Sequence, residues 1–215
     1  MAVRNVIECW LQQAHSIGMK KYAFSSQKAA LWAIVSGSFI GGVASFLQVI
    51  ERITWGEQLH APAKALACDL SSSFSCSSVF GAWQSSVFGF SNSLLCVTFF
   101  AVMLGFGLAA LYSDNLQKAA RLTAQFFSLF FLAFGAWYLT QTIFVVGSLC
   151  IFCVACYAGV IMINWGWLRL NVHDLPLKAS WRNALERGIA HGADTFAWLL
   201  YTFFFVILYY VKFGL

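Results

Sequence analysis

Long apolar runs alternate with short polar segments along the whole chain. Five of these runs approach or exceed the roughly 20 residues that a helix needs to cross the hydrocarbon core of a membrane. In lipid each run is expected to be a helix, because an open strand would leave backbone groups without hydrogen-bond partners. The pattern therefore predicts an all-α integral membrane protein. The expected spans are Ala29 to Ile50, Asn92 to Tyr112, Leu122 to Val146, Leu149 to Leu168 and Thr195 to Val211.

The longest segment between two spans covers residues 51–91. Within it Val79, Phe80, Trp83 and Val87 recur at helical spacing, so residues 77–88 are expected to form a short amphipathic helix on the membrane surface. Such a helix could serve as a lid over a site or could be an ordinary surface helix, and the pattern favours neither. Gly147-Ser148 predicts a tight turn between the third and fourth spans.

The composition agrees with a membrane protein. Of the 215 residues, 60% are hydrophobic and 10% are charged, a balance that excludes a soluble domain of this size. The 22 Phe and 9 Trp suit lipid-facing helices, interfacial belts and a pocket for a flat apolar ligand alike. Composition does not separate these three uses.

The basic residues predict the topology. The formal net charge is +5, but the 13 Lys and Arg are spread between the apolar runs, which argues against a nucleic-acid-binding surface. Ten of them lie outside the spans on one side, and the positive-inside rule makes this side cytoplasmic. The loop 51–91 and the turn at Gly147 are then extracytoplasmic, and the first span reads as an uncleaved anchor. The other three basic residues are Arg52, Lys64 and Lys212.

Seven cysteines are present, so at least one must be free within a single chain. Cys150 and Cys153 lie three residues apart at the expected start of the fourth helix, on one face and close enough to form a disulfide after a small adjustment. The helix amino terminus is expected to lower the pKa of Cys150 and to increase its thiolate fraction. Alternatively, the two are simply small buried apolar residues.

A second pair, Cys68 and Cys76, lies eight residues apart in the loop 51–91. It could be a mobile carrier that exchanges electrons with the helix pair, or a static disulfide that staples an extracytoplasmic loop. Two pairs on one face of the membrane favour thiol–disulfide exchange. Cys9, Cys96 and Cys156 are interpreted as ordinary reduced residues.

Four segments together resemble the vitamin K epoxide reductase family. They share with it an eight-residue interval between two loop cysteines, a CxxC at a helix start and a Tyr four residues beyond. The similarity covers roughly residues 29–168. The segments are Ala67-Cys68-Asp69-Leu70, Ser75-Cys76-Ser77-Ser78-Val79-Phe80, Phe90-Ser91-Asn92-Ser93 and Leu149-Cys150-Ile151-Phe152-Cys153-Val154-Ala155-Cys156-Tyr157.

The resemblance implies a four-helix bundle around a quinone of menaquinone, ubiquinone or phylloquinone type. The bundle would be a catalytic domain at residues 29–168, between a cytoplasmic arm at 1–28 and a cytoplasmic linker at 169–194, with a fifth helix at 195–215. Some bacterial relatives carry a fused thioredoxin-like domain after the fifth helix. This chain ends at Leu215, so a separate thioredoxin-fold partner outside the cytoplasmic (inner) membrane is expected.

The resemblance also implies roles for single residues. Cys153 would lie next to the quinone ring, Cys150 would exchange with Cys76, and Cys68 would take electrons from the partner. Asn92 and Tyr157 would hydrogen-bond the quinone oxygens. Without the motif, Asn92 could be a helix cap and Tyr157 an interfacial ring.

Two further positions compare with the family. Asp69 matches a family acidic residue, although a solvated loop carboxylate is an equally ordinary interpretation. Ala82 stands where relatives commonly have a hydroxyl residue, so the role of that hydroxyl is missing or falls to Ser85 or Ser86.

The expected activity is that of a quinone-dependent thiol oxidoreductase that supports disulfide formation. The main alternative is a membrane metal-binding or transport protein that uses the four paired cysteines as soft ligands, although no His lies at a typical ligand spacing from them. A second alternative is a non-catalytic scaffold with a stapled loop.

Overall fold

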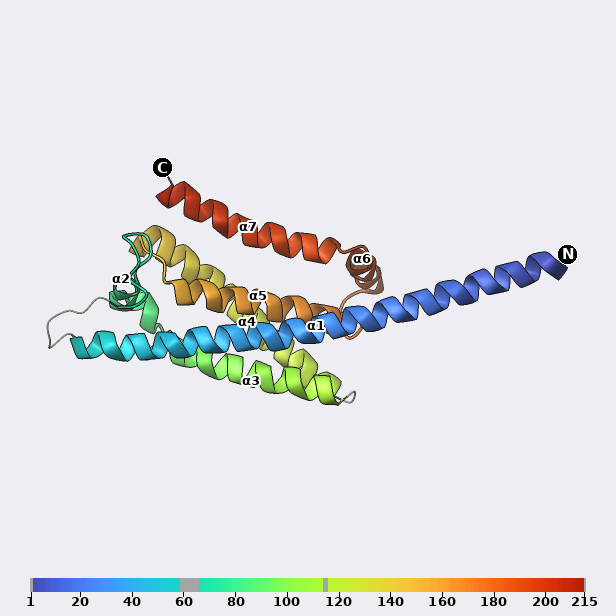
Figure 1. The fold of residues 1–215 in the computed structure, drawn as a ribbon, viewed down its shortest axis with the longest axis horizontal. Coiled ribbons are helices and arrows are strands. Elements are labelled where there is room, and N and C mark those ends of the chain that lie inside the picture. Colours follow the sequence, from blue (N-terminus) through green and yellow to red (C-terminus); the bar gives the residue numbers. More distant parts are fainter. Residues whose placement is uncertain (1, 59–65, 114–115, 215) are drawn as a thin grey trace.

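The structure is a computed structural model that describes residues 2–58, 66–113 and 116–214, with side chains described from residue 27 onward. Five long helices form the fold, and α1, α3, α4 and α5 pack together while α7 lies along one side (Figure 1). Two short helices and a π-helical turn lie at one end of the bundle, and α6 leads into α7. The elements are α1 (Ala2–Gln58), α2 (Cys76–Gly81), the 3₁₀ helix η1 (Trp83–Ser86), α3 (Asn92–Tyr112), α4 (Lys118–Gln141), the π turn η2 (Thr142–Val146), α5 (Ile151–Asn171), α6 (Ala179–Ala190) and α7 (Ala193–Phe213).

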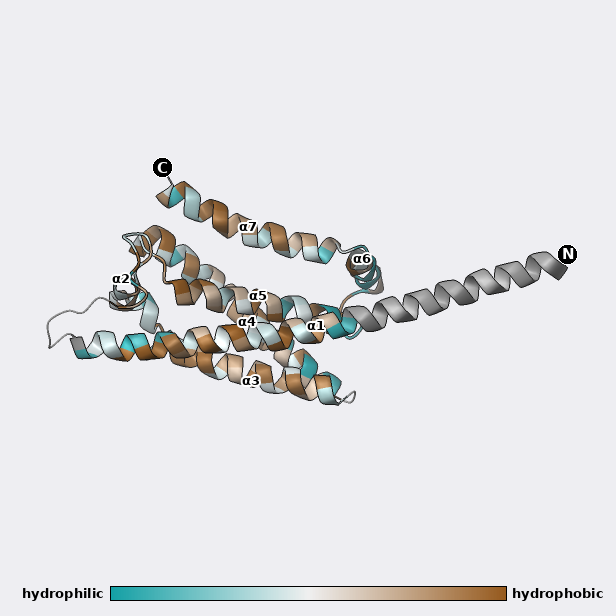
Figure 2. Ribbon diagram, viewed as in Figure 1, coloured by the Kyte–Doolittle hydropathy of each residue, from teal (hydrophilic) through white to brown (hydrophobic). Residues whose placement is uncertain are grey.

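The five long helices confirm the predicted all-α membrane fold, since each has a segment long and apolar enough to cross a membrane. Apolar residues predominate along these segments, and hydrophilic residues gather towards the helix ends (Figure 2). The protein is therefore a multi-pass membrane protein. The segments are Gln27–Glu57, Asn92–Tyr112, Lys118–Val146, Ile151–Asn171 and Ala193–Phe213.

Three of the differences from the sequence prediction lie at the end of the bundle that contains the two short helices. The first span runs past Ile50 to Glu57, because Glu51 and Arg52 lower the local hydropathy without breaking the helix. The fourth helix begins at Ile151, because Leu149 has extended backbone that pairs with another segment. Residues 77–88 form two short helices that are separated at Ala82, whose backbone is extended.

Glycines bring α1 and α5 into backbone contact. A Cβ atom added to Gly159 would lie 2.5 Å from the carbonyl oxygen of Gly37, and one added to Gly37 would lie 2.8 Å from the carbonyl oxygen of Gly159. Small residues commonly allow this close approach between membrane helices, where packing rather than water exclusion drives association. The approach of α1 to α5 is what brings side chains of both helices to the same site.

The Gly159→Ala variant is therefore expected to be destabilised by about 1–3 kcal/mol, because the added methyl group forces the two backbones apart. Gly105→Ala is the matched control, since nothing lies within 4 Å of a Cβ atom at that position of α3. It should be neutral or slightly stabilising. Thermal unfolding of both variants in the same detergent tests the expectation, and equal midpoints for the two would refute it.

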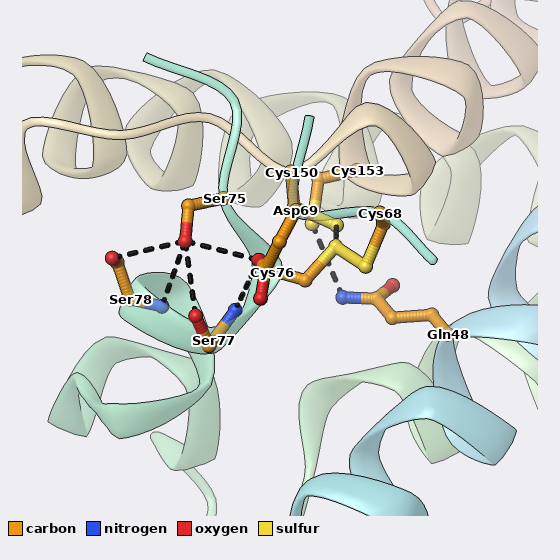
Figure 3. The surroundings of a disulfide bond; sticks show 9 residues. All are labelled: Gln48, Cys68, Asp69, Ser75, Cys76, Ser77, Ser78, Cys150 and Cys153. Atoms are coloured by element: carbon orange, nitrogen blue, oxygen red, sulfur yellow. Dashed lines mark hydrogen bonds between the residues drawn. A yellow bond between two sulfur atoms is a disulfide. The ribbon is translucent and has the colours of Figure 1, made fainter. Parts of the chain in front are cut away.

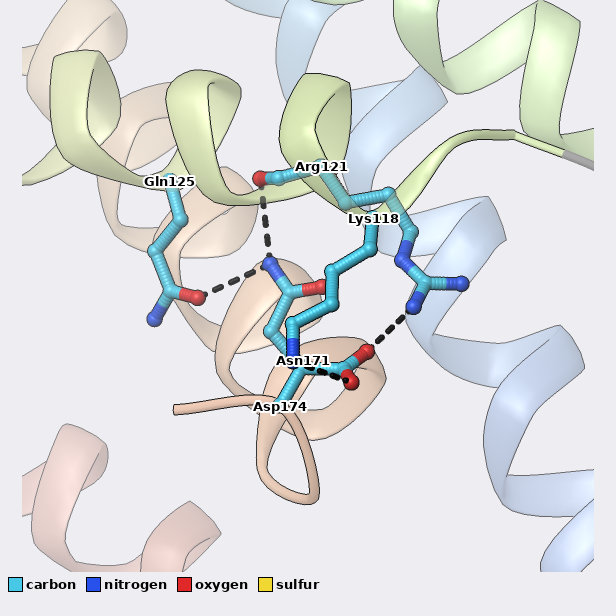
Figure 4. A network of polar contacts seen from close by, with 5 residues as sticks. All are labelled: Lys118, Arg121, Gln125, Asn171 and Asp174. Carbon is cyan, nitrogen blue, oxygen red and sulfur yellow. Dashed lines mark hydrogen bonds and ion pairs between the residues drawn. The ribbon is translucent and has the colours of Figure 1, made fainter. Parts of the chain in front are cut away.

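A polar network joins α4 and α5 at the end of the bundle where α6 lies (Figure 4). The Asn171 side-chain amide donates to the backbone carbonyl of Arg121 at 3.1 Å and to Gln125 Oε1 at 2.9 Å. Asp174 pairs with Arg121 and with Lys118, whose Nζ lies 3.2 Å away. Burial opposes ionisation of Asp174, but hydrogen bonds from these two cations hold its pKa below the ordinary value. The network keeps α4 and α5 in one register.

An ion pair ties α7 to the bundle. The Arg169 guanidinium of α5 donates to both carboxylate oxygens of Asp194, at 2.6 and 2.9 Å, and Asp194 is buried. Such bidentate pairs are among the stronger polar contacts. Further along α7, the Tyr201 hydroxyl is hydrogen-bonded to that of Tyr157 on α5. The fifth span is therefore fixed beside α5.

Candidate functional site

An isolated parallel bridge between Phe74 and Leu149 assembles the site. The Ser75 N–H donates to the Leu149 carbonyl at 3.0 Å, and the Leu149 N–H donates to the Ser73 carbonyl at 2.9 Å. The Ser148 hydroxyl adds a bond to the Ser72 carbonyl at 3.0 Å. Gly147, with φ of 73°, makes the turn that presents this backbone. These contacts place Cys76, the next residue after Ser75, beside Cys150, the next residue after Leu149.

Four sulfur atoms meet at this end of the bundle (Figure 3). Cys68 and Cys76 form a disulfide, and Cys76 Sγ lies 3.1 Å from Cys150 Sγ. Cys150 and Cys153 are free and buried. The two cysteine pairs, which are more than seventy residues apart in the sequence, thus form one cluster, called here the sulfur cluster.

The sulfur of Cys150 lies at the amino terminus of α5, where Cys150 is the residue that precedes the first helical turn. A hydrogen bond from the Cys153 thiol and the backbone N–H groups of Phe152 and Cys153 lower the pKa of Cys150, and they outweigh the opposing effect of burial. The direction agrees with the sequence expectation. A thiolate at this position is the nucleophilic form of a cysteine in disulfide exchange.

Asp69 organises the loop between Cys68 and Cys76. Its carboxylate accepts hydrogen bonds from the Ser75 hydroxyl at 3.0 Å and the Ser77 N–H at 3.1 Å. Burial raises its pKa, but these hydrogen bonds hold the pKa below the ordinary value. The Ser75 hydroxyl in turn caps α2 through the Ser78 N–H. Asp69 is thus a structural cap at the first turn of α2 rather than a solvated carboxylate.

A narrow cavity of about 610 Å³, including the space at its mouth, begins beside Cys153. It lies between α1, α3, α4 and α5, and the two short helices close over it. Small-molecule sites are commonly apolar with a few polar groups, and the lining of this cavity has that character. The apolar walls are mostly aromatic and sulfur-containing, with side chains from Phe80, Cys96, Phe100, Phe131, Phe134, Tyr138, Leu139, Cys153, Cys156, Tyr157 and Val160.

Asn92 and Tyr157, the two residues that the resemblance assigns to a quinone, both line this cavity. The Asn92 amide nitrogen donates to the Gln84 carbonyl of η1 at 2.7 Å, and its Oδ1 is buried without a hydrogen-bond partner. The Tyr157 hydroxyl donates to the Leu132 carbonyl at 3.2 Å and is also hydrogen-bonded to Tyr201. Asn92 therefore offers an unpaired acceptor oxygen to the cavity. The hydroxyl of Tyr157 is hydrogen-bonded to Leu132 of α4 and Tyr201 of α7.

The chemistry of the cavity lining suits the headgroup of a quinone. Aromatic rings offer flat apolar walls, and a buried amide oxygen without a partner is costly unless a ligand or water hydrogen-bonds to it. The Asn92 Oδ1 is an acceptor, so the ligand atom that complements it is a hydroxyl, as in the reduced quinol. Cys153 contributes a sulfur atom to the same wall.

Sequence reasoning missed Arg52, which holds the two short helices onto α1. Its guanidinium donates to the Phe80 carbonyl and to the hydroxyls of Ser85 at 3.1 Å and Ser86 at 3.3 Å. It also lies over the rings of Trp55 and Phe80. Its place directly after the first apolar run was the available signal, because charged residues close to a membrane span commonly pair with backbone carbonyls or other side chains.

Ser85, one of the two serines that follow Ala82, has a hydroxyl that joins the two short helices. The Ser85 hydroxyl donates to the Phe80 carbonyl at 3.0 Å and to the Ala82 carbonyl at 2.8 Å, and it accepts from Arg52. Ser85 also lines the cavity. These hydrogen bonds connect α1, α2 and η1 at the cavity.

The other predicted cysteines lie in different places. Cys96 and Cys156 are free and both line the cavity. The side chain of Cys9 lies outside the described residues. Among the side chains that the structure describes, no group of three or more His, Cys, Asp and Glu could hold a metal ion.

One comparison with known proteins gives a match. The model of the vitamin K epoxide reductase family matches residues 32–168, which is more than half of the chain. That range contains the sulfur cluster, the cavity and the helices α3, α4 and most of α5. A search of curated proteins gave no match.

Proposed function

The chain belongs to the vitamin K epoxide reductase family, and we propose that it reoxidises the thiols of a thioredoxin-fold partner and passes the electrons to a quinone. The family is one of oxidoreductases that are generally linked to quinones. The specific proposal is a relay in which Cys68 and Cys76 receive the electrons and Cys150 and Cys153 pass them to the cavity. Its product would be a disulfide in the partner.

The observation that carries the proposal is the 3.1 Å separation of Cys76 Sγ and Cys150 Sγ. Exchange requires a thiolate to reach one sulfur of a disulfide, and these atoms are already in contact. Cys153, the partner of Cys150, lies on the wall of the cavity. The three sulfurs thus form a continuous path from the loop to the cavity.

Internal exchange has a defined order in this geometry. With the loop pair reduced and the helix pair oxidised, the Cys76 thiolate attacks Cys150 Sγ, and the Cys150–Cys153 bond breaks with its electron pair on Cys153. Cys68 then attacks Cys76, which restores the loop disulfide and releases Cys150. The structure has the loop disulfide and two free helix cysteines, which is the arrangement that follows this exchange.

A quinone bound in the cavity would supply the acceptor for two electrons and two protons and would leave as quinol. The two thiol groups of the helix pair release two electrons and two protons when they form a disulfide, so the reaction balances. Cys153 would face the ring, and Asn92 Oδ1 would accept a hydrogen bond from a hydroxyl of the quinol, with its amide oriented by the hydrogen bond to the Gln84 carbonyl. The aromatic walls would exclude water from this part of the site.

Access of the partner to Cys68 requires movement of the loop. Cys68 is buried, whereas its neighbours Ala67 and Leu70 are exposed. The proposed partner would attack after residues 66–70 shift away from the bundle. This step distinguishes the relay from a static staple, in which Cys68 would remain covered.

The proposed orientation follows the basic residues. The sulfur cluster would face the extracytoplasmic side of the inner membrane, with Lys118, Arg121 and the linker at 169–194 in the cytoplasm. In this arrangement residues 29–168 are the catalytic domain, and the arm at 1–28 is cytoplasmic. An oxidising compartment on the side of the sulfur cluster would suit disulfide formation.

A direct assay tests the proposed function. The purified full chain in lipid nanodiscs is mixed anaerobically with a reduced thioredoxin-fold protein and either a menaquinone or a ubiquinone analogue. One quinol is expected for each disulfide formed. Absence of quinol with every quinone type tested, or a stoichiometric amount of bound zinc or copper in the active preparation, would overturn the proposal.

A further inference from the structure

Gln48 contacts the sulfur cluster from the side of α1 (Figure 3). Its Nε2 donates to Cys153 Sγ at 3.1 Å, and the side chain is 7% exposed. Gln48 also lines the cavity together with Cys153. The contact joins residues 105 positions apart and depends on the close approach of α1 to α5 at Gly37 and Gly159.

A buried amide in a membrane helix is expensive unless its hydrogen bonds are satisfied. Neutral sulfur is a weak acceptor, so a hydrogen bond to a thiol offsets little of the free energy needed to bury the amide. A thiolate is a charged acceptor, and hydrogen bonds to charged groups contribute more than bonds between neutral groups. The geometry of Gln48 is therefore matched to Cys153 in its deprotonated form.

We propose that Gln48 is a catalytic residue that stabilises the Cys153 thiolate as it is released from the Cys150–Cys153 disulfide. The inference rests on the proposed function, because that release belongs to the relay. When the Cys76 thiolate bonds to Cys150, the electron pair of the broken bond moves to Cys153 Sγ. The Gln48 N–H points at the atom where this charge develops, so the donor is in place before exchange begins.

The same donor lies beside the sulfur in the lining of the cavity. Gln48, Asn92 and Ser85 provide polar atoms in a lining that is otherwise mainly apolar. Of these three, Gln48 donates a hydrogen bond to a reacting sulfur. Its effect should therefore fall on sulfur chemistry at Cys153 rather than on the tightness of ligand binding.

The test measures alkylation of Cys153 in the fully reduced chain as a function of pH, with N-ethylmaleimide and site-resolved mass spectrometry. Gln48→Met keeps the side-chain length and removes the donor. It is expected to lower the Cys153 alkylation rate about tenfold below the pH midpoint and to move that midpoint up by about one pH unit. Ser45→Ala is the matched control, since Ser45 is buried one turn away and donates to the Gly42 carbonyl at 3.0 Å.

A second variant keeps the test decisive if Gln48→Met does not fold. Gln48→Asn retains an amide but shortens it by one methylene, so it should show the same direction of shift at Cys153. A wild-type midpoint in folded Gln48→Met or Gln48→Asn would overturn the role of Gln48.

The two proposals fail separately. Alkylation of Cys153 does not depend on quinone turnover. If Gln48→Met shifts the pH midpoint of alkylation but the wild-type chain forms no quinol, the relay is refuted, while the stabilisation of the Cys153 thiolate by Gln48 is supported. A relay that turns over normally in Gln48→Met, with an unshifted midpoint, would refute the Gln48 proposal alone. A loss of quinol formation at neutral pH that recovers at high pH would support both.

Discussion

Replacing Cys153 with alanine is expected to lower quinol formation by a factor on the order of 10³ or more, because the nucleophile beside the cavity is lost. The remaining Cys150 can still bond to Cys76, but Cys150 alone cannot form the helix disulfide whose two electrons would reduce the acceptor. Electrons would therefore stop at the sulfur cluster. Quinol absorbance in the anaerobic assay, with saturating reduced partner, measures the effect.

Cys9→Ala is a suitable control for this variant, since it removes one of the cysteines interpreted as ordinary and should retain wild-type turnover. Thermal unfolding of the Cys153→Ala chain separates a chemical defect from misfolding. Wild-type turnover in folded Cys153→Ala would exclude Cys153 as the thiol that faces the acceptor.

The second large effect is expected for Cys76→Ser. In the proposed relay the partner exchanges with Cys68, and Cys76 can reverse that exchange by attacking the mixed disulfide, because these two loop cysteines form the disulfide seen in the structure. In Cys76→Ser, Cys68 is a free thiol and nothing in the loop can reverse its exchange with a partner disulfide. The variant is mixed with a single-cysteine form of the partner whose thiol is activated as a disulfide with thionitrobenzoate, so attack by Cys68 releases thionitrobenzoate. Non-reducing electrophoresis should show a near-complete shift to the mixed species, which a reductant reverses.

Cys68→Ser is the matched comparison, as it changes the other sulfur of the same disulfide. The buried Cys76, held next to Cys150, should capture little partner in that variant. Equal capture by both variants would mean that the partner reaches either loop cysteine, and the assigned order of the relay would be wrong.

The helices and the cysteine pairs could be predicted from local sequence. A membrane span needs a continuous apolar run, so hydropathy located Asn92–Tyr112 with the limits that the structure shows. The CxxC spacing and the turn at Gly147 likewise depend on neighbouring residues, and both lie where the pattern predicted them. The end of the first span was less predictable from polar residues, because Arg52 continues the helix and has hydrogen-bond partners in the two short helices.

The contact between the two cysteine pairs could not be predicted from sequence spacing alone. It depends on the bridge between Phe74 and Leu149, and no periodicity predicts a single backbone pairing between a loop and a turn. The family resemblance implied the exchange of Cys76 with Cys150, and the 3.1 Å contact is a physical basis for it. The hidden position of Cys68 was also unexpected, since loop cysteines in isolation read as exposed.

Gln48 and Arg52 show why part of the site escaped sequence reasoning. Gln48 is one polar residue in an apolar run and Arg52 lies just after that run, and both patterns also occur for residues with purely structural contacts. Their partners, Cys153 and the carbonyl of Phe80, lie 105 and 28 residues away. These contacts of Gln48 and Arg52 follow from the packing of α1 against α5 and against the two short helices, which the sequence pattern does not specify.

The path of electrons through the sulfur cluster is tested most directly by the double variant Cys68→Ala/Cys153→Ala, in which Cys76 and Cys150 lack their usual disulfide partners. After mild oxidation of the full chain in nanodiscs, mass spectrometry of the digested protein identifies the disulfide that forms. The relay predicts a Cys76–Cys150 disulfide in most molecules. Recovery of both thiols free, or paired with other cysteines, would contradict it.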